Sequence, residues 1–214
     1  MTVLNNMSVL AGGAIALSGC MAVPFPTEIS REISIEGSEF VYSLEDEVFE
    51  DDLNGRSGTA TYVGVGLVAG ATDEIEDRAI LGDTSLDLNF DKATMTAEMT
   101  NLEAYRLPAE QVAAIEDGTL DSRDVEWDVE SIPGRVEVRN GIIWGESMGG
   151  DVSATLTGHG IEFVISGGVI GRFLESGTWF AQLDEGADFS FTADGVPLID
   201  PRLSIGGNEV VTSP

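Results

Sequence analysis

The sequence has very few of the residues from which reactive and metal-binding sites are built. Its 214 residues include one cysteine, Cys20, and one histidine, His159. One cysteine excludes an internal disulfide and a cluster of metal-bound thiolates. One histidine leaves no second histidine for a metal site and a single candidate for the base of a Ser-His-Asp triad. These shortages predict a protein that is not an enzyme and needs no cofactor.

Basic residues are also scarce. The chain has 10 Lys and Arg residues, of which only Lys92 is a lysine, against 38 Asp and Glu residues, and its formal net charge is −28. Such a charge repels nucleic acid and anionic membrane surfaces, so neither is expected as a partner. It attracts cations or the basic face of a protein. An adaptation of solubility, for example to a salty habitat, explains the same charge without any partner.

The apolar stretch 7–17 is too short to span a bilayer, which takes about 20 residues. It has the length of the hydrophobic region of a signal peptide, and it runs into Leu17-Ser18-Gly19-Cys20. This resembles the lipobox of bacterial lipoproteins, whose cysteine is lipidated and becomes the mature N-terminus. We predict a signal peptide at 1–19 and a lipid anchor on Cys20 as the sole membrane attachment. An unreactive cysteine in a buried helix is the alternative. Met21 after the cysteine favours anchoring in the outer membrane. It does not indicate whether the protein lies on the periplasmic or the surface-exposed face of that membrane.

Beyond residue 58 the apolar residues recur with a period of two, which is typical of half-buried β-strands. Residues 86–90 and 95–99 follow this pattern, and the connector Asp91-Lys92-Ala93 joins them as a hairpin. Further strands are predicted at 125–130, 135–139, 152–157, 161–173, 178–183 and 188–193. The exception is 108–117, where an initial proline, an acidic first turn and a following glycine predict one short helix.

We therefore predict an all-β fold, namely a single, roughly eight-stranded antiparallel β-barrel with one short helix inserted. The barrel is expected to be soluble, because the polar faces of its strands are dense in Asp, Glu, Thr and Ser, so the apolar faces must form the interior. The predicted boundaries are a tether with an acidic segment at 20–57, the barrel at 58–195 and a C-terminal tail at 196–214. Large side chains are expected to fill the interior: Leu86, Leu88, Phe90, Met95, Met99, Trp127, Phe189 and Phe191.

Charge and aromatic patterns predict a second hairpin, with residues 131–134 as its loop. Such a loop would place acidic side chains of one strand opposite arginines of the next, and an indole opposite a valine. The predicted pairs are Glu130 with Arg135, Glu126 with Arg139 and Trp127 with Val138.

The segment 58–66, Gly-Thr-Ala-Thr-Tyr-Val-Gly-Val-Gly, resembles the opening strand of the barrel domains in the transferrin-binding protein B family. Residues 86–97 are similar to the second hairpin of that family, a leucine-aspartate-phenylalanine strand followed by a threonine-rich one. The resemblance covers residues 58–193 and implies a surface lipoprotein of Gram-negative bacteria with a barrel that binds a protein. The chain is too short for the two-lobed architecture that binds transferrin, so that activity is not implied.

Three local features are candidate sites. Glu50, Asp52 and Asn54 alternate before a glycine, as in the first half of a calcium-binding loop, although a solvated acidic loop explains the same residues. His159 lies between two glycines, and we expect it to be exposed in a tight turn. The glycines at 64 and 66 are expected to bend a strand at a corner of the barrel.

The sequence thus predicts a lipid-anchored, non-catalytic binding lipoprotein of the cell envelope that presents loops to a protein partner. The alternative is a small-ligand carrier with a hollow interior, since an eight-stranded barrel can enclose one small molecule. The size of the predicted interior side chains favours the protein-binding role. The ligand itself has no recognisable signature in the sequence.

Overall fold

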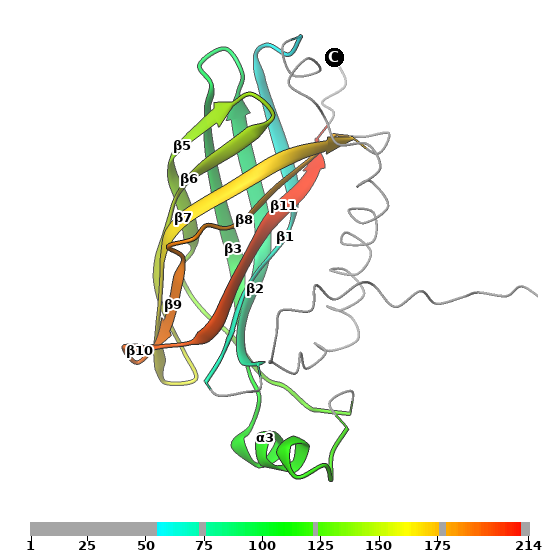
Figure 1. Ribbon diagram of the computed structural model, residues 1–214, viewed down its shortest axis with the longest axis vertical. Coiled ribbons are helices and arrows are strands. Elements are labelled where there is room, and N and C mark those ends of the chain that lie inside the picture. The colour runs from blue at the N-terminus through cyan, green and yellow to red at the C-terminus, as the bar shows by residue number, and fades with distance from the viewer. Residues whose placement is uncertain (1–54, 73–75, 122–123, 176–178, 211–214) are drawn as a thin grey trace, which may run out of the picture.

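The computed structural model describes residues 55–72, 76–121, 124–175 and 179–210. Eight antiparallel strands form a closed barrel, each paired with its two neighbours around the ring (Figure 1). In ring order they are β1 (Thr59–Ala71), β2 (Glu76–Asn89), β3 (Thr94–Arg106), β5 (Val136–Trp144), β6 (Ser147–Gly158), β7 (Ile161–Glu175), β8 (Trp179–Glu185) and β11 (Ile199–Glu209). The predicted all-β barrel is therefore confirmed. No helix within the described ranges has the length and apolar character needed to cross a membrane.

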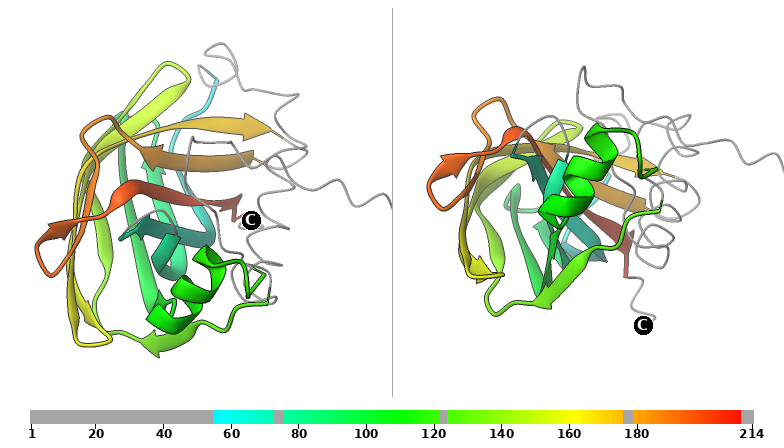
Figure 2. Two further views of the ribbon diagram at one scale, coloured as in Figure 1. Left: turned by 60° about the horizontal axis from the view of Figure 1, so that its bottom comes forward. Right: turned by 90° about the horizontal axis from the view of Figure 1, so that it is seen from below.

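Four shorter elements complete the fold: α3 (Ala109–Glu116), β4 (Asp128–Ser131), β9 (Ser190–Ala193) and β10 (Val196–Pro197). The helix lies at the lower end of the barrel, which Figure 2 shows from below. It begins after Pro108 and ends before Gly118, whose φ of +75° ends the helix without the strain that a side chain would add. The predicted helix is thus confirmed.

Alternation along the strands places the apolar side chains inside, as predicted. Leu86, Leu88, Met95, Met99 and Phe191 are buried in the core, and the partly buried Phe90 and Phe189 pack against it. The interior is filled so closely that several inward glycines have no room for a methyl group. A Cβ at position 82 would lie 2.6 Å from a Leu102 methyl, and one at position 158 would lie 2.7 Å from an Ile132 methyl.

Polar side chains close the upper end of the barrel. Arg56 donates from Nη2 to Glu209 at 2.5 Å and from Nη1 to the Tyr62 hydroxyl at 3.3 Å. The Arg56 guanidinium also lies 4.9 Å from the centre of the Phe90 ring, which contacts Phe173 in turn. Because Tyr62 is fully buried, burial raises the pKa of its hydroxyl well above the usual range.

The ring contains a seam below β8. β8 pairs with β7 and β11, but the chain then bulges at 186–189 before β9 resumes pairing with β7. Among the described residues, β11 from 199 to 203 has strand partners on the β1 side only. Side chains close this gap. A carboxylate oxygen of Glu185 accepts a hydrogen bond from the Leu203 amide. Leu198 and Phe191 fill the space beside β1, since a Cβ at Gly70 would lie only 2.9 Å from Leu198 and 3.3 Å from Phe191.

Two predictions, one about strand pairing and one about the end of the barrel, were wrong. β4 and β5 do not form a hairpin, because both pair with β3, β4 along 103–106 and β5 along 94–99. The predicted pairs of Glu130 with Arg135 and Glu126 with Arg139 are therefore absent from this region. The barrel also runs on to Glu209 in β11 instead of ending at residue 195, so most of the stretch predicted as a tail is a strand.

Trp127 lies outside the barrel, and its prediction as an interior residue opposite Val138 was wrong. Its indole meets the outward-facing Tyr105 ring edge-on, with centroids 6.3 Å apart. Both belong to an apolar cluster on the outer side of β1, β2 and β3, which also contains Ala69, Ala79 and Leu81. Trp127 also packs against the small cluster around Leu107 and Ile115, and so joins the helix to the barrel wall.

Candidate functional site

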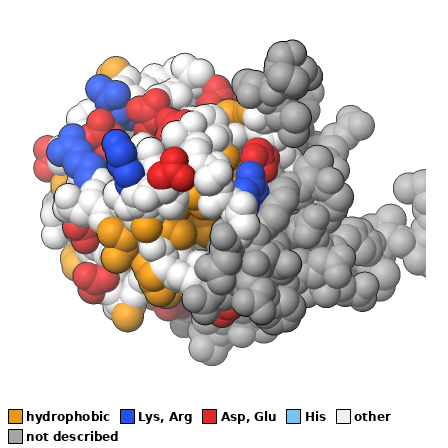
Figure 3. Space-filling model, turned by 90° about the horizontal axis from the view of Figure 1, so that it is seen from above, with side chains coloured by type: hydrophobic (Ala, Val, Ile, Leu, Met, Phe, Trp, Pro, Cys, Tyr) orange, Lys and Arg blue, Asp and Glu red, His pale blue; other side chains and the backbone are white. Residues whose placement is uncertain are grey.

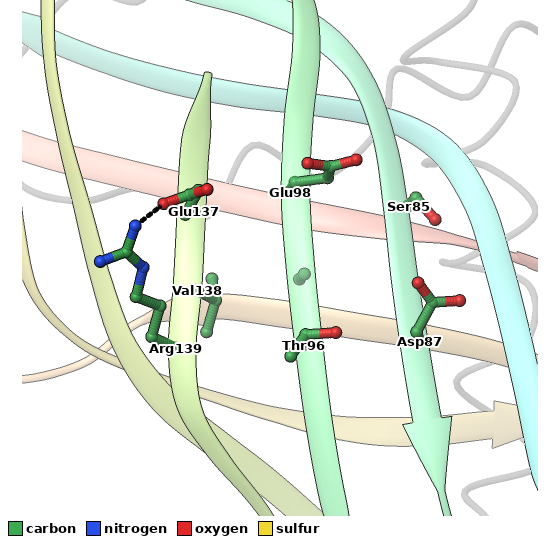
Figure 4. A pocket seen from close by; sticks show the side chains of 8 residues that line it. Ser85, Asp87, Thr96, Glu98, Glu137, Val138 and Arg139 are labelled. Atoms are coloured by element: carbon green, nitrogen blue, oxygen red, sulfur yellow. Dashed lines mark hydrogen bonds and ion pairs between the residues drawn. The ribbon is translucent and has the colours of Figure 1, made fainter. Parts of the chain in front are cut away.

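The outer face of β2, β3 and β5 carries an open depression of about 360 Å³ (Figure 4). Each strand contributes outward-facing polar side chains at alternate positions, as the period of two requires. The polar residues of this acidic face are Ser85, Asp87, Thr96, Glu98, Glu137 and Arg139. The apolar side chains of the same strands point into the core, so one segment of each strand supplies both the acidic face and its rigid support.

Two carboxylates at the centre of the acidic face lie directly opposite each other. Glu98 of β3 and Glu137 of β5 are cross-strand partners, an arrangement that is destabilising for like charges. Arg135 relieves it by contacting both, with Nη1 3.4 Å from Glu98 Oε2 and Nε 3.2 Å from Glu137 Oε1. Arg139 also pairs with Glu137. More than half of each arginine side chain is exposed, so these ion pairs are open to exchange with another cation.

Neutral donors hold the neighbouring carboxylates. The Thr61 hydroxyl donates to Asp87 at 2.6 Å, and the Asn101 amide donates to Asp83 at 2.7 Å. Such hydrogen bonds orient the carboxylates without neutralising them. The face therefore offers fixed negative charges to a cationic group such as a lysine or arginine of a partner. Within the described ranges no three His, Cys, Asp or Glu side chains are placed to hold a metal ion.

His159 was predicted to be exposed, and this prediction was wrong. It forms the two-residue β6–β7 turn with Gly160, and both have positive φ, as a tight hairpin turn requires. Its side chain is only 6% exposed and turns into the lower end of the barrel. There Nε2 lies 3.0 Å from the Ala104 carbonyl oxygen, and Nδ1 lies 3.4 Å from Asp128 Oδ2. The glycines on both sides of His159 predicted the turn correctly. The neighbouring sequence contains no signal for the contacts with Ala104 and Asp128, which are distant in the chain.

Two ion pairs lie at this end of the barrel, one partly exposed and the other largely buried. Arg106 donates to Asp128 at 2.5 Å, and Arg78, its cross-strand partner, donates to Asp77 at 2.6 Å. Burial lowers the pKa of Arg78, and the nearby Arg106 charge lowers it further, against the opposing effect of Asp77. The first pair links β3 to β4, whereas the second lies within β2. We interpret both as structural features of this end of the barrel.

The remaining predicted sites have separate outcomes. Cys20 and the candidate calcium ligands Glu50, Asp52 and Asn54 lie outside the described residues. The glycine at 66 has a packing role: a Cβ there would lie 2.6 Å from the Thr84 methyl and 2.8 Å from the Met99 sulfur.

The pattern G-x-S-x-G of serine hydrolases was predicted to be absent, and this was wrong, because residues 145–149, Gly-Glu-Ser-Met-Gly, match it. In hydrolases this pattern forms a strand–turn–helix elbow that presents a nucleophilic serine. Here its first two residues form the turn between β5 and β6, and Ser147 is the first residue of β6. His159 follows the last residue of the same strand, so the twelve-residue strand separates serine from histidine. This arrangement does not form a catalytic pair.

A scan against models of protein families finds no match to the chain, and a search of curated proteins finds no relative either.

Proposed function

We propose that this chain is a lipid-anchored binding protein of the bacterial cell envelope, without catalytic activity, and that it holds a protein partner on the outside of its barrel. The observation that carries this proposal is the packed interior. Inward glycines at 66, 82 and 158 have no space even for a methyl group, so the described core has no room for a ligand there. This packing argues against the alternative of a hollow small-ligand carrier.

The charge of the chain favours a basic partner. At a net charge of −28, long-range attraction accelerates encounter with a positively charged surface and repels an acidic one. The acidic face provides fixed carboxylates for such a partner, and the two exposed arginines that pair with them, Arg135 and Arg139, can exchange their counter-ions during docking. The resemblance to surface lipoproteins with transferrin-binding-protein-like barrels supports the same role, and a lipid on Cys20 would keep the barrel at the membrane.

Capture from an envelope extract tests the binding surface, with the full chain carrying Cys20→Ser as a lipid-free bait. The variant Asp87→Asn with Glu98→Gln removes two charges from the acidic face. The control Glu116→Gln with Asp124→Asn removes two exposed charges near the helix. We expect a basic protein to bind the parent and the control, to elute with salt, and to bind the acidic-face variant at least tenfold more weakly. Equal retention by both variants would refute a role of this face.

Two further measurements test the rest of the function. We expect Cys20→Ser to abolish both the labelling of the protein with lipid and its partition into the detergent phase. Normal processing of this variant would contradict the prediction of a lipid anchor. Mass spectrometry of the purified and denatured protein tests the carrier alternative. A stoichiometric apolar molecule released on unfolding would favour the carrier over the protein-binding role.

A further inference from the structure

Three large apolar side chains point outward near the upper end of β5 and β7. Ile142 is 54% exposed, Trp144 45% and Ile170 52%. Ile142 and Ile170 are the cross-strand neighbours of Gly149, one on each side of β6. Figure 3, which views the upper end, shows hydrophobic side chains at the surface among charged ones. The three side chains thus surround a single glycine, and we call them the Trp144 platform.

Gly149 explains how the indole is placed. A Cβ at this position would lie 2.9 Å from Trp144 Cη2 and 3.4 Å from Cζ3, so the six-membered ring occupies the space above the glycine. The indole therefore lies across β6 instead of standing away from the sheet. The backbone covers one side of it, and close to half of the side chain remains exposed. Since β5 pairs with β6 from Ile142 to Trp144 and β6 pairs with β7 throughout, the platform is preorganised, and binding would require little further ordering.

Polar residues border the platform on three sides. Thr94 is the cross-strand partner of Ile142, and Asp184 is that of Ile170. Ser147 pairs with Trp144 on one side and with Arg172 on the other. Because cross-strand partners share a face of the sheet, these side chains surround the apolar centre with hydrogen-bond donors and acceptors.

We infer that the Trp144 platform binds an uncharged sugar ring. A pyranose has C–H groups on its faces and hydroxyls around its edge, so it matches an apolar centre with a polar border. The C–H face would pack on the indole, and the hydroxyls would bond with the border residues. This site adjoins the acidic face on β3 and β5 but shares no residue with it, and the inference does not depend on the function proposed above.

Size and charge favour a sugar over other occupants. A stable protein interface buries about 800 Å² on each partner, far more than three half-exposed side chains provide. A second copy of the chain would bring another charge of −28 to the contact, and an anionic ligand would be repelled in the same way. An uncharged ring avoids that repulsion, and its area suits one indole with an aliphatic side chain on either side.

Titration with three uncharged oligosaccharides, maltohexaose, cellohexaose and chitohexaose, tests the inference. The full chain carrying Cys20→Ser is followed by calorimetry and tryptophan fluorescence at up to about 10 mM sugar. We expect saturable binding of at least one of them, weakened at least tenfold by Trp144→Ala and less by Trp144→Phe. Circular dichroism checks that each variant keeps the fold.

Trp127→Phe is the matched control, because this indole packs against Tyr105 on a different part of the outer surface. It should leave sugar affinity unchanged. The inference fails if none of the three sugars binds, if Trp144→Ala binds as tightly as the parent, or if Trp127→Phe weakens binding equally. It also fails if Trp144→Ala abolishes self-association of the chain and changes no sugar affinity, since the platform would then join two copies. Capture of a basic partner by the acidic face would be unaffected in either case.

Discussion

Replacement of Gly66 by alanine is expected to destabilise the barrel by overpacking its interior. The new Cβ would lie 2.6 Å from Thr84 Cγ2 and 2.8 Å from Met99 Sδ. Met99 is fully buried, and Thr84 is held by a buried hydrogen bond from its hydroxyl to the Gly206 carbonyl oxygen at 2.7 Å. Thr84 cannot turn away without breaking this bond. Overpacking of this kind costs about 1–3 kcal/mol. In a domain of this size that lowers Tm by roughly 2–12 °C.

Urea unfolding of the full chain with Cys20→Ser, followed by tryptophan fluorescence, measures the effect. Thr84→Ser removes the clashing methyl and keeps the hydroxyl, so it should recover much of the loss when combined with Gly66→Ala. A double-mutant cycle measures this coupling. Gly55→Ala is the control, since no atom lies within 4 Å of its Cβ position. Unchanged stability in Gly66→Ala, or strictly additive effects of the two core changes, would refute the claim of a packed interior.

Two further predictions concern pH and salt. Burial raises the pKa of both Tyr62 and Tyr105 above the usual range, and a hydrogen bond to Glu103 raises that of Tyr105 further. The stability that the two buried, protonated phenols contribute to the fold is therefore complete below about pH 10. It falls as the pH rises above about 10, since the phenols of the unfolded chain then lose their protons first. An absorbance titration that shows both phenols ionised in folded protein near pH 10 would contradict this. Self-repulsion at −28 predicts that Tm rises with NaCl. If the acidic residues act only through this repulsion, Ca²⁺ should not raise Tm further at constant high NaCl. A Ca²⁺-dependent increase in Tm that Asp52→Ala abolishes would instead show a calcium site.

The features that could be predicted from the sequence depend on short-range patterns. Alternation of apolar and polar residues through 86–90 and 95–99 identified the β2–β3 hairpin, because side chains in a strand alternate between the two faces. Pro108 and Gly118 marked the ends of α3 to within about a residue. Since most strands carry one apolar face, the same pattern predicted a packed apolar interior of a sandwich or a barrel.

The features that sequence reasoning missed depend on long-range partners. Complementary charges on 124–130 and 135–139 suggested a hairpin, but both segments find a better partner in β3. β11 was missed because Asp200 has a φ of +45°, Pro201 follows it, and two glycines at 206–207 interrupt the alternation. The acidic face combines side chains from three strands, and the Trp144 platform combines side chains of β5 and β7 across a glycine of β6. Their composition is therefore fixed only by the register between strands.

The seam between β9 and β11 makes the stability of the ring uneven. Above it, β8 is bonded through its backbone to a strand on each side, whereas at the seam Phe191, Leu198 and Glu185 close the wall with side chains. We therefore expect the hairpin of β9 and β10 to open as a local unit while the upper ring stays intact. Opening would break its four pairings with β7, the hydrogen bonds between Asp194 and Glu162, and the contact of Phe191 with Phe163. Such sub-global opening would give amides of the hairpin faster hydrogen exchange than those of β6, and would admit water to the core without unfolding the barrel.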